Sequence, residues 1–340
     1  MDHPALTTEK ALFSCPACGG ALTADREAYR CPGCVRIYPI VFGIPDFRLA
    51  PDPYISFVEE YEKARVLAEE AERRSFEELV RFYWQMTPGV PPEAVARYTR
   101  YALDGERRAR VYLNAVDAHL GRTWIGDSCL DIGCGTGGFL LGAGDRFHEL
   151  VGVDIALRWL IVARKRLEGR AENIVLVCCS AEHLPFPGGK FDAAVGLDVL
   201  EHAEDAPAVL SEAARTLRSG GLCYLATPNR FSIGPEPCVR LWGVGFLPRG
   251  LARLYVQQIR GVPYRQIRLL SFFDLRRLLR RSGLRHWRIA PAPVPLDASA
   301  GLSRVAQGLL RFYNALRGHP ILARVLLIVG PYLQVVARPR

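Results

Sequence analysis

The segment from Ser128 to Ala143, SCLDIGCGTGGFLLGA, constrains the fold more than any other part of the chain. A short apolar run with β-forming residues enters a turn with the pattern Gly133-x-Gly135-x-x-Gly138, and an apolar helical pattern leaves it. Glycines let the backbone turn tightly and pass close to a ligand, and the start of the following helix suits an anionic group. The segment therefore predicts a strand, a turn and a helix, with a nucleotide of some kind at the turn.

Short apolar runs alternate with helical patterns after this segment. Strands are expected near 128–132, 149–153, 174–178, 191–196 and 221–226, and helices near 137–143, 156–168, 206–218 and 271–282. Such alternation predicts a parallel sheet covered on both faces. Two later strand-like runs, 286–294 and 332–338, have no short crossover between them and predict an antiparallel pair at the sheet edge. The expected fold class is α/β, with a Rossmann-like, mostly parallel sheet of seven strands.

Four cysteines near the N-terminus follow the pattern C-x2-C-x12-C-x2-C; they are Cys15, Cys18, Cys31 and Cys34. Two such knuckles place four thiolates around one tetrahedral Zn²⁺, and a closed site of four sulfurs is structural. About fifty residues surround these cysteines, too few for a strong core, so the metal would supply much of the folding free energy. The run Tyr38–Phe47 follows as a short apolar strand that ends in a Gly/Pro turn. We therefore predict a small N-terminal zinc ribbon.

The rest of the chain divides by pattern. Helical patterns occupy 56–86 and 93–120, separated by a proline-rich stretch. The expected domains are a zinc ribbon at 1–50, a helical linker or lid at 51–120, and the main domain at 121–340, which carries a substrate-side insertion at about 229–270 and a helical insert at about 301–328.

Charge is distributed unevenly. Residues 240–340 hold 18 arginines, no lysine and two acids, a net charge of +16, whereas the whole chain carries +9. This predicts an anionic partner: RNA, a phosphorylated substrate or a membrane surface. Because arginine outnumbers lysine 40 to 4 throughout the chain, a solvated Arg-rich surface is the alternative.

The sequence also leads to expectations about location. Residues 1–10 do not resemble a secretory signal, and the ten cysteines then favour a reducing cytoplasm. The apolar stretch Ile321–Val336 is interrupted by Arg324 and by Gly330-Pro331, so we expect no transmembrane segment. Peripheral contact with a membrane stays open, and the oligomeric state is not predicted.

Two acids refine the nucleotide site. Asp154 follows Gly133 by 21 residues, at the end of the second expected strand, where a carboxylate can accept hydrogen bonds from both ribose hydroxyls. NAD and S-adenosylmethionine both fit that position. Asp131 separates them, because an acid two residues before the first glycine repels a pyrophosphate but suits an ammonium and a sulfonium.

Four segments resemble motifs of the class I S-adenosylmethionine-dependent methyltransferases, in the branch that includes the quinone-biosynthesis methyltransferases. In chain order they are LDIGCGTGGF, GVDIA, AEHLPFPGGKFDAAVGLDVLEH and ARTLRSGGLCYLATPNR, and the similarity covers roughly 100–290. The resemblance implies cofactor-binding residues around the methionyl part (Asp131, Gly133, Gly135, Gly137), the ribose (Asp154, Ile155) and the adenine (Ser180, Ala181, Glu182), with Asp198 and Val199 at the end of the fourth strand. Many relatives have Asp where this chain has Ser180.

The N-terminal cysteine segment resembles the zinc ribbons of a tRNA-methyltransferase activator and of bacterial rRNA guanine methyltransferases. The resemblance covers about fifty residues and includes YPIVFGIPDF. It implies a place near RNA. In the rRNA family the last zinc ligand is not a cysteine, whereas here it is Cys34.

Methyl transfer needs alignment and exclusion of water more than a fixed catalytic motif. His202, four residues after Asp198, is the candidate general base, and Glu201 or His183 could assist it or bind a metal. His202 as a packing residue at a helix start is equally open. The leading interpretation is an enzyme that methylates a small aromatic, sugar or lipid-linked acceptor. The alternatives are an RNA base methyltransferase and a non-catalytic partner protein that docks through its ribbon.

Overall fold

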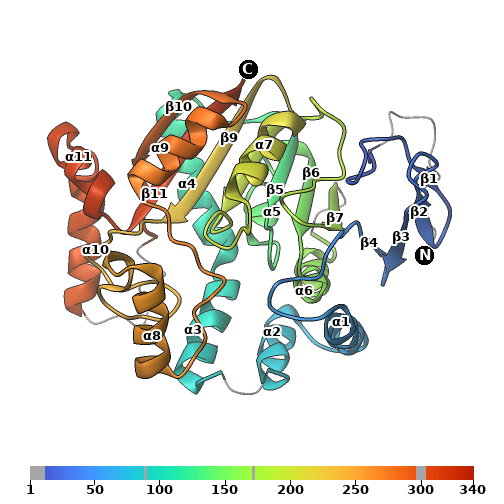
Figure 1. The fold of residues 1–340 in the computed structure, drawn as a ribbon, viewed down its shortest axis with the longest axis horizontal. Helices are drawn as coiled ribbons and strands as arrows, with labels where there is room; N and C mark the ends of the chain where they lie inside the picture. The colour runs from blue at the N-terminus through green and yellow to red at the C-terminus, as the bar shows by residue number, and fades with distance from the viewer. Residues whose placement is uncertain (1–11, 88–89, 171–172, 296–303) are drawn as a thin grey trace.

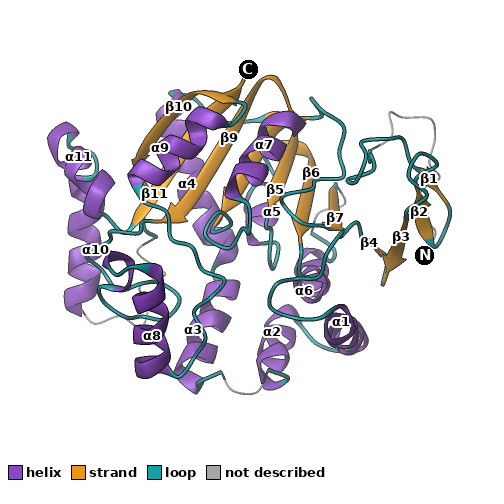
Figure 2. Ribbon diagram, in the orientation of Figure 1, coloured by secondary structure: helices purple, strands orange, loops and turns teal. Residues whose placement is uncertain are grey.

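A seven-stranded sheet forms the centre of the protein in the computed structural model, which describes residues 12–87, 90–170, 173–295 and 304–340 (Figures 1 and 2). The strand order is β10-β11-β9-β8-β5-β6-β7. The strands are β5 (Gly126–Ile132), β6 (Phe147–Asp154), β7 (Ile174–Cys178), β8 (Phe191–Leu197), β9 (Leu217–Pro228), β10 (Leu284–Pro291) and β11 (Tyr332–Pro339). All of the strands expected in this region are present.

Strand direction confirms the expected α/β class. β5 to β9 are mutually parallel, and β10 and β11 pair in antiparallel fashion. Because β11 is also antiparallel to β9, only β11 runs against the rest, and the edge strand β10 runs with them. The carboxyl ends of β5, β6, β8, β9 and β10 therefore meet at one edge of the sheet, where ligands of open α/β sheets bind.

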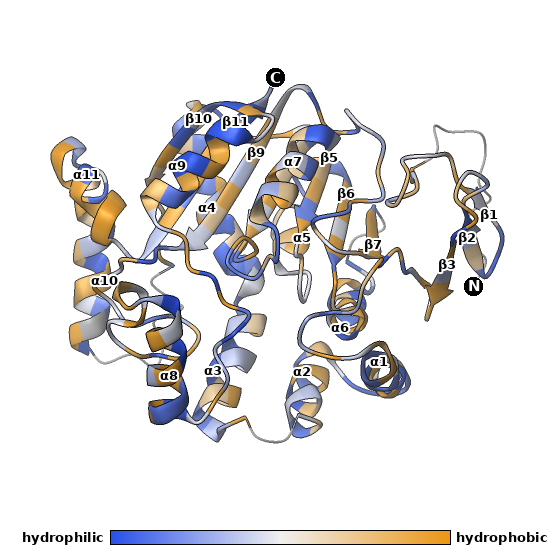
Figure 3. Cartoon of the chain, viewed as in Figure 1, coloured by the Kyte–Doolittle hydropathy of each residue, from blue (hydrophilic) through white to orange (hydrophobic). Residues whose placement is uncertain are grey.

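Helices cover both faces of the sheet. One face packs against α1 (Phe57–Ala71), α2 (Phe76–Gln85), α3 (Pro92–Leu103), α4 (Gly105–Leu120), α5 (Gly138–Gly142) and α6 (Leu157–Leu167). The other face packs against α7 (Ala206–Thr216), α9 (Phe272–Arg281) and the N-terminal segment. Figure 3 shows that the central strands are largely apolar, and buried apolar residues of the helices pack against both faces of the sheet.

Three boundaries differ from the sequence pattern. The expected helix 56–86 is two helices, since Ser75 forms a capping box with Glu78 and begins α2. The expected helix 93–120 also divides, at Asp104. The expected helix 206–218 ends at Thr216, because Leu217 already has extended backbone and pairs with Phe191 as the start of β9. The helical pattern of apolar and charged residues continues across these positions, so periodicity alone did not predict the breaks.

The ribbon extends the free edge of the sheet. Its strands β1 (Thr23–Ala24), β2 (Ala28–Arg30), β3 (Ile37–Val41) and β4 (Ile44–Pro45) form an antiparallel sheet. Directly after β4, Asp46 forms a parallel bridge with Cys178 of β7, and the Phe47 N–H donates to the Cys178 carbonyl over 2.7 Å. The Phe13 ring packs against Phe47 and Phe186 with centroids 5.0 and 5.8 Å apart. The ribbon thus shares a core with the large sheet and protects its edge strand.

Both expected insertions contain helices. Residues 229–270 hold a short 3₁₀ helix (Val244–Phe246) and α8 (Arg249–Arg260), which bury an apolar cluster of their own. The expected insert at 301–328 is two helices, α10 (Arg304–Leu316) and α11 (Pro320–Val329); its first three residues lie outside the described part of the chain.

Candidate active site

The glycine loop after β5 needs glycine for two different reasons. Gly133, Gly135 and Gly137 all have positive φ, at 72°, 51° and 72°. A Cβ on Gly133 would lie 2.4 Å from Cγ2 of Val199, so the close approach of the two loops also excludes a side chain there. A Cβ on Gly135 would meet nothing within 4 Å. The loop is therefore packed on the β8 side at Gly133 and open at Gly135, where a ligand has room.

Asp131 is the carboxylate directly behind this loop. Its side chain is 2% exposed, and Oδ2 has no hydrogen-bond partner among the described residues. Burial raises the pKa of Asp131 far above its ordinary value, and the nearby charge of Asp154 adds to the shift. A buried acceptor without a partner is costly to leave unpaired. It is explained if a cationic donor occupies the site.

Asp154 stands at the end of β6 and holds the glycine loop. Its Oδ2 accepts the Gly135 N–H over 2.9 Å, and its Oδ1 accepts the Ala156 N–H over 2.8 Å. Burial raises the pKa of Asp154 to about 6, although these two amide donors lower it in part. The neighbouring Ile155 carbonyl accepts a hydrogen bond from Nη1 of Arg48 over 3.3 Å. The segment that follows β4 thus contacts the loop at the end of β6.

Ser180, Ala181 and Glu182 form the loop that follows β7. The Ser180 hydroxyl donates to the Glu182 carboxylate. Oε1 of Glu182 accepts the N–H groups of Glu204 and Asp205 over 3.0 and 3.4 Å. Glu182 therefore ties this loop to the loop before α7.

Asp198 directly follows the end of β8. Its φ of 57° is unusual for a residue other than glycine. Oδ2 accepts the Tyr101 hydroxyl over 2.5 Å, while the buried Oδ1 has no partner among the described residues. Burial raises the pKa of Asp198, and the hydroxyls of Tyr101 and Tyr332 partly offset the rise. This carboxylate is positioned by side chains far away in the sequence.

Glu201 and His202 follow and have different surroundings. Glu201 is 2% exposed, and its Oε2 accepts the Thr227 hydroxyl over 2.9 Å. Burial raises the pKa of Glu201 well above its ordinary value, and the nearby charge of Asp198 adds to the rise. His202 is half-buried, and its Nδ1 lies 2.9 Å from the Tyr54 hydroxyl. Burial lowers the pKa of His202, which keeps the imidazole neutral near pH 7. His183 is exposed, in the loop between β7 and β8.

A buried ion pair places Tyr54. Nη1 of Arg158, on α6, lies 2.8 Å from Oδ2 of Asp52 and also pairs with Glu60. Oδ1 of Asp52 accepts the Tyr54 N–H over 2.9 Å. The linker at 52–54 is therefore fixed to α6, and its tyrosine is delivered to His202. No local pattern marks Tyr54 or Tyr101, because each partner lies about a hundred residues or more away in the chain.

Asn229 and Arg230, at the start of the expected substrate-side insertion, make structural contacts. The Asn229 amide donates to the carbonyls of Ile328 and Gly330 over 2.9 Å each, and so holds the end of α11. Nε of Arg230 donates to the Gly245 carbonyl over 3.0 Å. In the same insertion Tyr264 is buried, whereas Trp242 and Phe246 are exposed.

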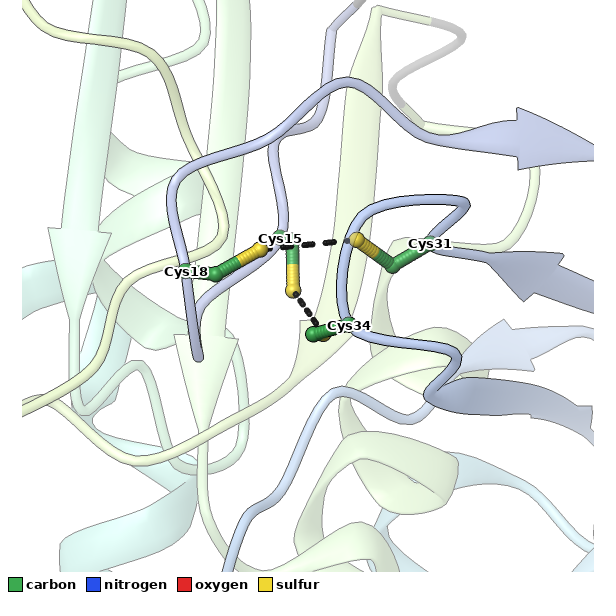
Figure 4. A group of neighbouring side chains, drawn as sticks. All are labelled: Cys15, Cys18, Cys31 and Cys34. Carbon is green, nitrogen blue, oxygen red and sulfur yellow. Dashed lines mark hydrogen bonds between the residues drawn. The ribbon is translucent and has the colours of Figure 1, made fainter.

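The four N-terminal cysteines point toward one another from two loops (Figure 4). Sγ of Cys15 lies 3.6 Å from Sγ of Cys34, and Sγ of Cys18 lies 3.5 Å from Sγ of Cys31. All four sulfurs lie within 4.8 Å of one another. A tetrahedron with Zn–S bonds of about 2.3 Å has edges of about 3.8 Å. The arrangement fits one tetrahedral metal ion.

Comparison with known proteins adds to this geometry. A family model described as a methyltransferase domain matches residues 130–225. The chain is 35% identical over 132 residues to the demethylmenaquinone methyltransferase of Tropheryma whipplei, covering 38% of this chain and 53% of that protein. It thus spans about half the length of that relative. It is 30% identical over 195 residues to the ubiquinone biosynthesis O-methyltransferase of Parvibaculum lavamentivorans, covering 55% of this chain and 74% of that protein.

The chain belongs to the class I S-adenosylmethionine-dependent methyltransferases. Among solved structures it is similar to a methyltransferase of Thermotoga maritima, with 20% identity, a TM-score of 0.46, and 72% and 96% of the two chains covered. The family model includes Asp131, Asp154 and the loop from Asp198 to His202 of this methyltransferase. Tyr54, Tyr101 and all residues after 225 lie outside that model.

Proposed function

We propose that this chain transfers the methyl group of S-adenosylmethionine to an O, N or C nucleophile of a small aromatic, sugar or lipid-linked acceptor. One observation carries the choice of donor: the buried Oδ2 of Asp131, two residues before the glycine loop, has no hydrogen-bond partner among the described residues. A carboxylate there suits the ammonium of the methionyl group and would repel a pyrophosphate. The names of the relatives, which refer to demethylmenaquinone and to ubiquinone biosynthesis, support a small acceptor.

In this proposal each sequence-derived residue keeps a defined place. Asp131 and the glycines at 133, 135 and 137 hold the methionyl part, and Asp154 with Ile155 holds the ribose. Ser180, Ala181 and Glu182 lie beside the adenine, with the Glu182 carboxylate fixing the loop. Asp198 and Val199 lie between cofactor and acceptor. Helices α1 to α4, from the linker at 51–120, and the insertion at 229–270 close the site from water.

The bound cofactor supplies an electrophilic methyl group on a sulfonium. The acceptor forms a bond to the methyl carbon as the carbon–sulfur bond breaks, and the electron pair of that bond stays on sulfur. An acceptor hydroxyl, amine or carbon acid must also lose a proton. His202 can take it at Nε2 when its Nδ1–H donates to the Tyr54 hydroxyl. Glu201, hydrogen-bonded to Thr227, is proposed to assist by positioning this loop.

The cysteine cluster is proposed to hold one structural Zn²⁺. The short sulfur–sulfur distances support this, as does the packing of the ribbon on β7. Metal analysis of the purified chain should find one zinc per chain, and Cys31→Ser should lose it together with the ribbon fold. Cys238→Ser is the control, because Cys238 lies in the distant insertion at 229–270. A folded wild-type chain without metal would contradict the zinc assignment.

An RNA acceptor is the second candidate, and the observation that favours it is the net charge of +16 on residues 240–340. Binding of bulk RNA across salt concentrations tests it, since phosphate contacts give a steep salt dependence. Salt-insensitive or absent binding supports the small acceptor.

Transfer of a tritiated methyl group into cell extract tests the enzyme assignment. The extract is separated into RNA, protein and small-molecule fractions, and Asp154→Ala serves as the inactive comparison. We expect label in the small-molecule fraction, dependent on Asp154. Label in RNA would move the assignment to the second candidate. No transfer to any fraction, with cofactor binding intact, would favour a non-catalytic partner protein.

A further inference from the structure

Helices α10 and α11 expose apolar side chains that no described part of the chain covers. On α10, Val305, Leu309 and Phe312 are 73%, 62% and 62% exposed, and their spacing places them on one helix face. On α11, Ile321 is 67% exposed, with Leu322 and Val325 beside it. Figure 3 shows α11 as one of the most apolar elements at the outer edge of the molecule. These six residues define the α10–α11 surface.

The opposite sides of the two helices are anchored. The Tyr313 hydroxyl donates to the Ala292 carbonyl over 2.7 Å, and the Asn314 amide donates to the Val294 carbonyl over 2.8 Å. Asn229 holds the end of α11 as described above. The apolar face is therefore presented outward by fixed helices, and burying it in this protein would require breaking these contacts.

Charge indicates what covers this surface. Exposed Arg304, Arg311 and Arg324 flank the apolar residues, and the sequence from 298 to 340 contains no acid. Short helices with an apolar face and an arginine-rich border bind in the interface of an anionic bilayer. A second protein molecule or RNA suits the pattern less well, because repulsion between arginines opposes self-association and exposed apolar side chains add little to phosphate contacts. Among the described helices, none is long and apolar enough to cross a membrane.

We propose that the α10–α11 surface docks the protein on a membrane rich in anionic lipid, with Leu309, Phe312 and Ile321 among the acyl chains and the arginines at the headgroups. The insert begins after Pro291, at the end of β10, and ends before Tyr332, at the start of β11. It therefore lies at the carboxyl edge of the sheet, on the side of Asp198. Docking there brings the acceptor side of the proposed enzyme toward the bilayer.

Co-sedimentation with vesicles tests the proposal. Wild-type protein should pellet with vesicles of equimolar phosphatidylcholine and phosphatidylglycerol, and much less with phosphatidylcholine alone. Leu309→Gln with Phe312→Gln should weaken binding more than about tenfold. Arg311→Gln with Arg324→Gln should weaken it roughly fivefold per arginine. The matched control is Val58→Gln with Tyr61→Gln on α1, which has the same spacing and exposed positions and should bind as wild type does.

Four results would overturn the proposal. The first is wild-type protein that does not bind anionic vesicles, and the second is an equal loss of vesicle binding in the α10–α11 variants and in the control variant. A lipid-free dimer that Leu309→Gln with Phe312→Gln converts to monomer would assign the surface to a second copy instead. RNA binding lost in the arginine variant, without vesicle binding, would assign it to nucleic acid. Vesicle binding needs no turnover, so it can succeed or fail independently of the proposed methyl transfer.

Discussion

The Gly135 amide donates to Oδ2 of Asp154 over 2.9 Å and so joins the loop after β5 to the end of β6. The same carboxylate is the proposed partner of the ribose hydroxyls. One residue thus shapes the loop that receives one end of the cofactor and binds another part of it. This coupling makes cofactor binding sensitive to the charge of a single side chain.

Cofactor affinity should fall as the pH falls through about 6. Burial raises the pKa of Asp154 to about 6, and the charged form is the better acceptor for two hydroxyls. Below that pH the dissociation constant should rise by up to roughly tenfold per pH unit. Calorimetric titration with S-adenosylmethionine between pH 5 and 8 measures this. Asp154→Asn should bind weakly and without this pH dependence; a variant that keeps the wild-type profile would refute the ribose role.

Asp131→Asn should separate stability from binding. In the ligand-free protein the substitution removes an ionisable group from a buried position where Oδ2 lacks a partner, so thermal stability should stay level or rise. Affinity for S-adenosylmethionine should fall roughly 10- to 100-fold, since a charge-assisted hydrogen bond is lost. Melting curves with and without cofactor check both effects. A large loss of stability without cofactor would show that Asp131 is a structural residue.

His202→Gln should lower the turnover number and remove the acidic limb of its pH profile. Burial lowers the pKa of His202, so in the wild type that limb should lie below pH 6.5, with a slope of roughly tenfold per pH unit. Tyr54→Phe removes the hydrogen bond to Nδ1 and should reduce turnover less than His202→Gln. Steady-state rates from pH 5 to 8 decide the matter. If the pH profile of His202→Gln is unchanged, His202 is not the general base and only packs in the site.

Gly133→Ala should destabilise the fold by about 2–4 kcal/mol, because it adds a positive-φ penalty to an overlap with Val199. Combining it with Val199→Ala should recover part of that loss. Gly121→Ala is the matched control: its φ is 68°, but its Cβ would meet nothing within 4 Å, so only about 1 kcal/mol is expected. Chemical denaturation measures all four proteins. Equal losses at Gly133 and Gly121 would mean that the contact with Val199 has no energetic weight.

The sequence by itself determined the elements with strong local signals. Asp131, the glycine loop and Asp154 are close in sequence or end adjacent strands, so their approach follows from strand–helix alternation. The paired C-x2-C knuckles likewise brought four sulfurs together, because each pair lies on one short turn. The seven strands and the antiparallel pair followed from hydrophobic periodicity.

Only the tertiary structure decided which distant groups meet. Tyr54 contacts His202 because a buried ion pair of Arg158 fixes the linker, and Tyr101 contacts Asp198 because α3 is folded over the sheet. The docking of Phe47 on Cys178, the contacts of Glu182 and the outward face of α10 also depend on packing across the chain. Periodicity reports which face of an element is apolar, but not which element, if any, covers it. For this reason the sequence specified the loop that joins Asp131 and Asp154, whereas the surroundings of Asp198 and His202 were set by long-range contacts.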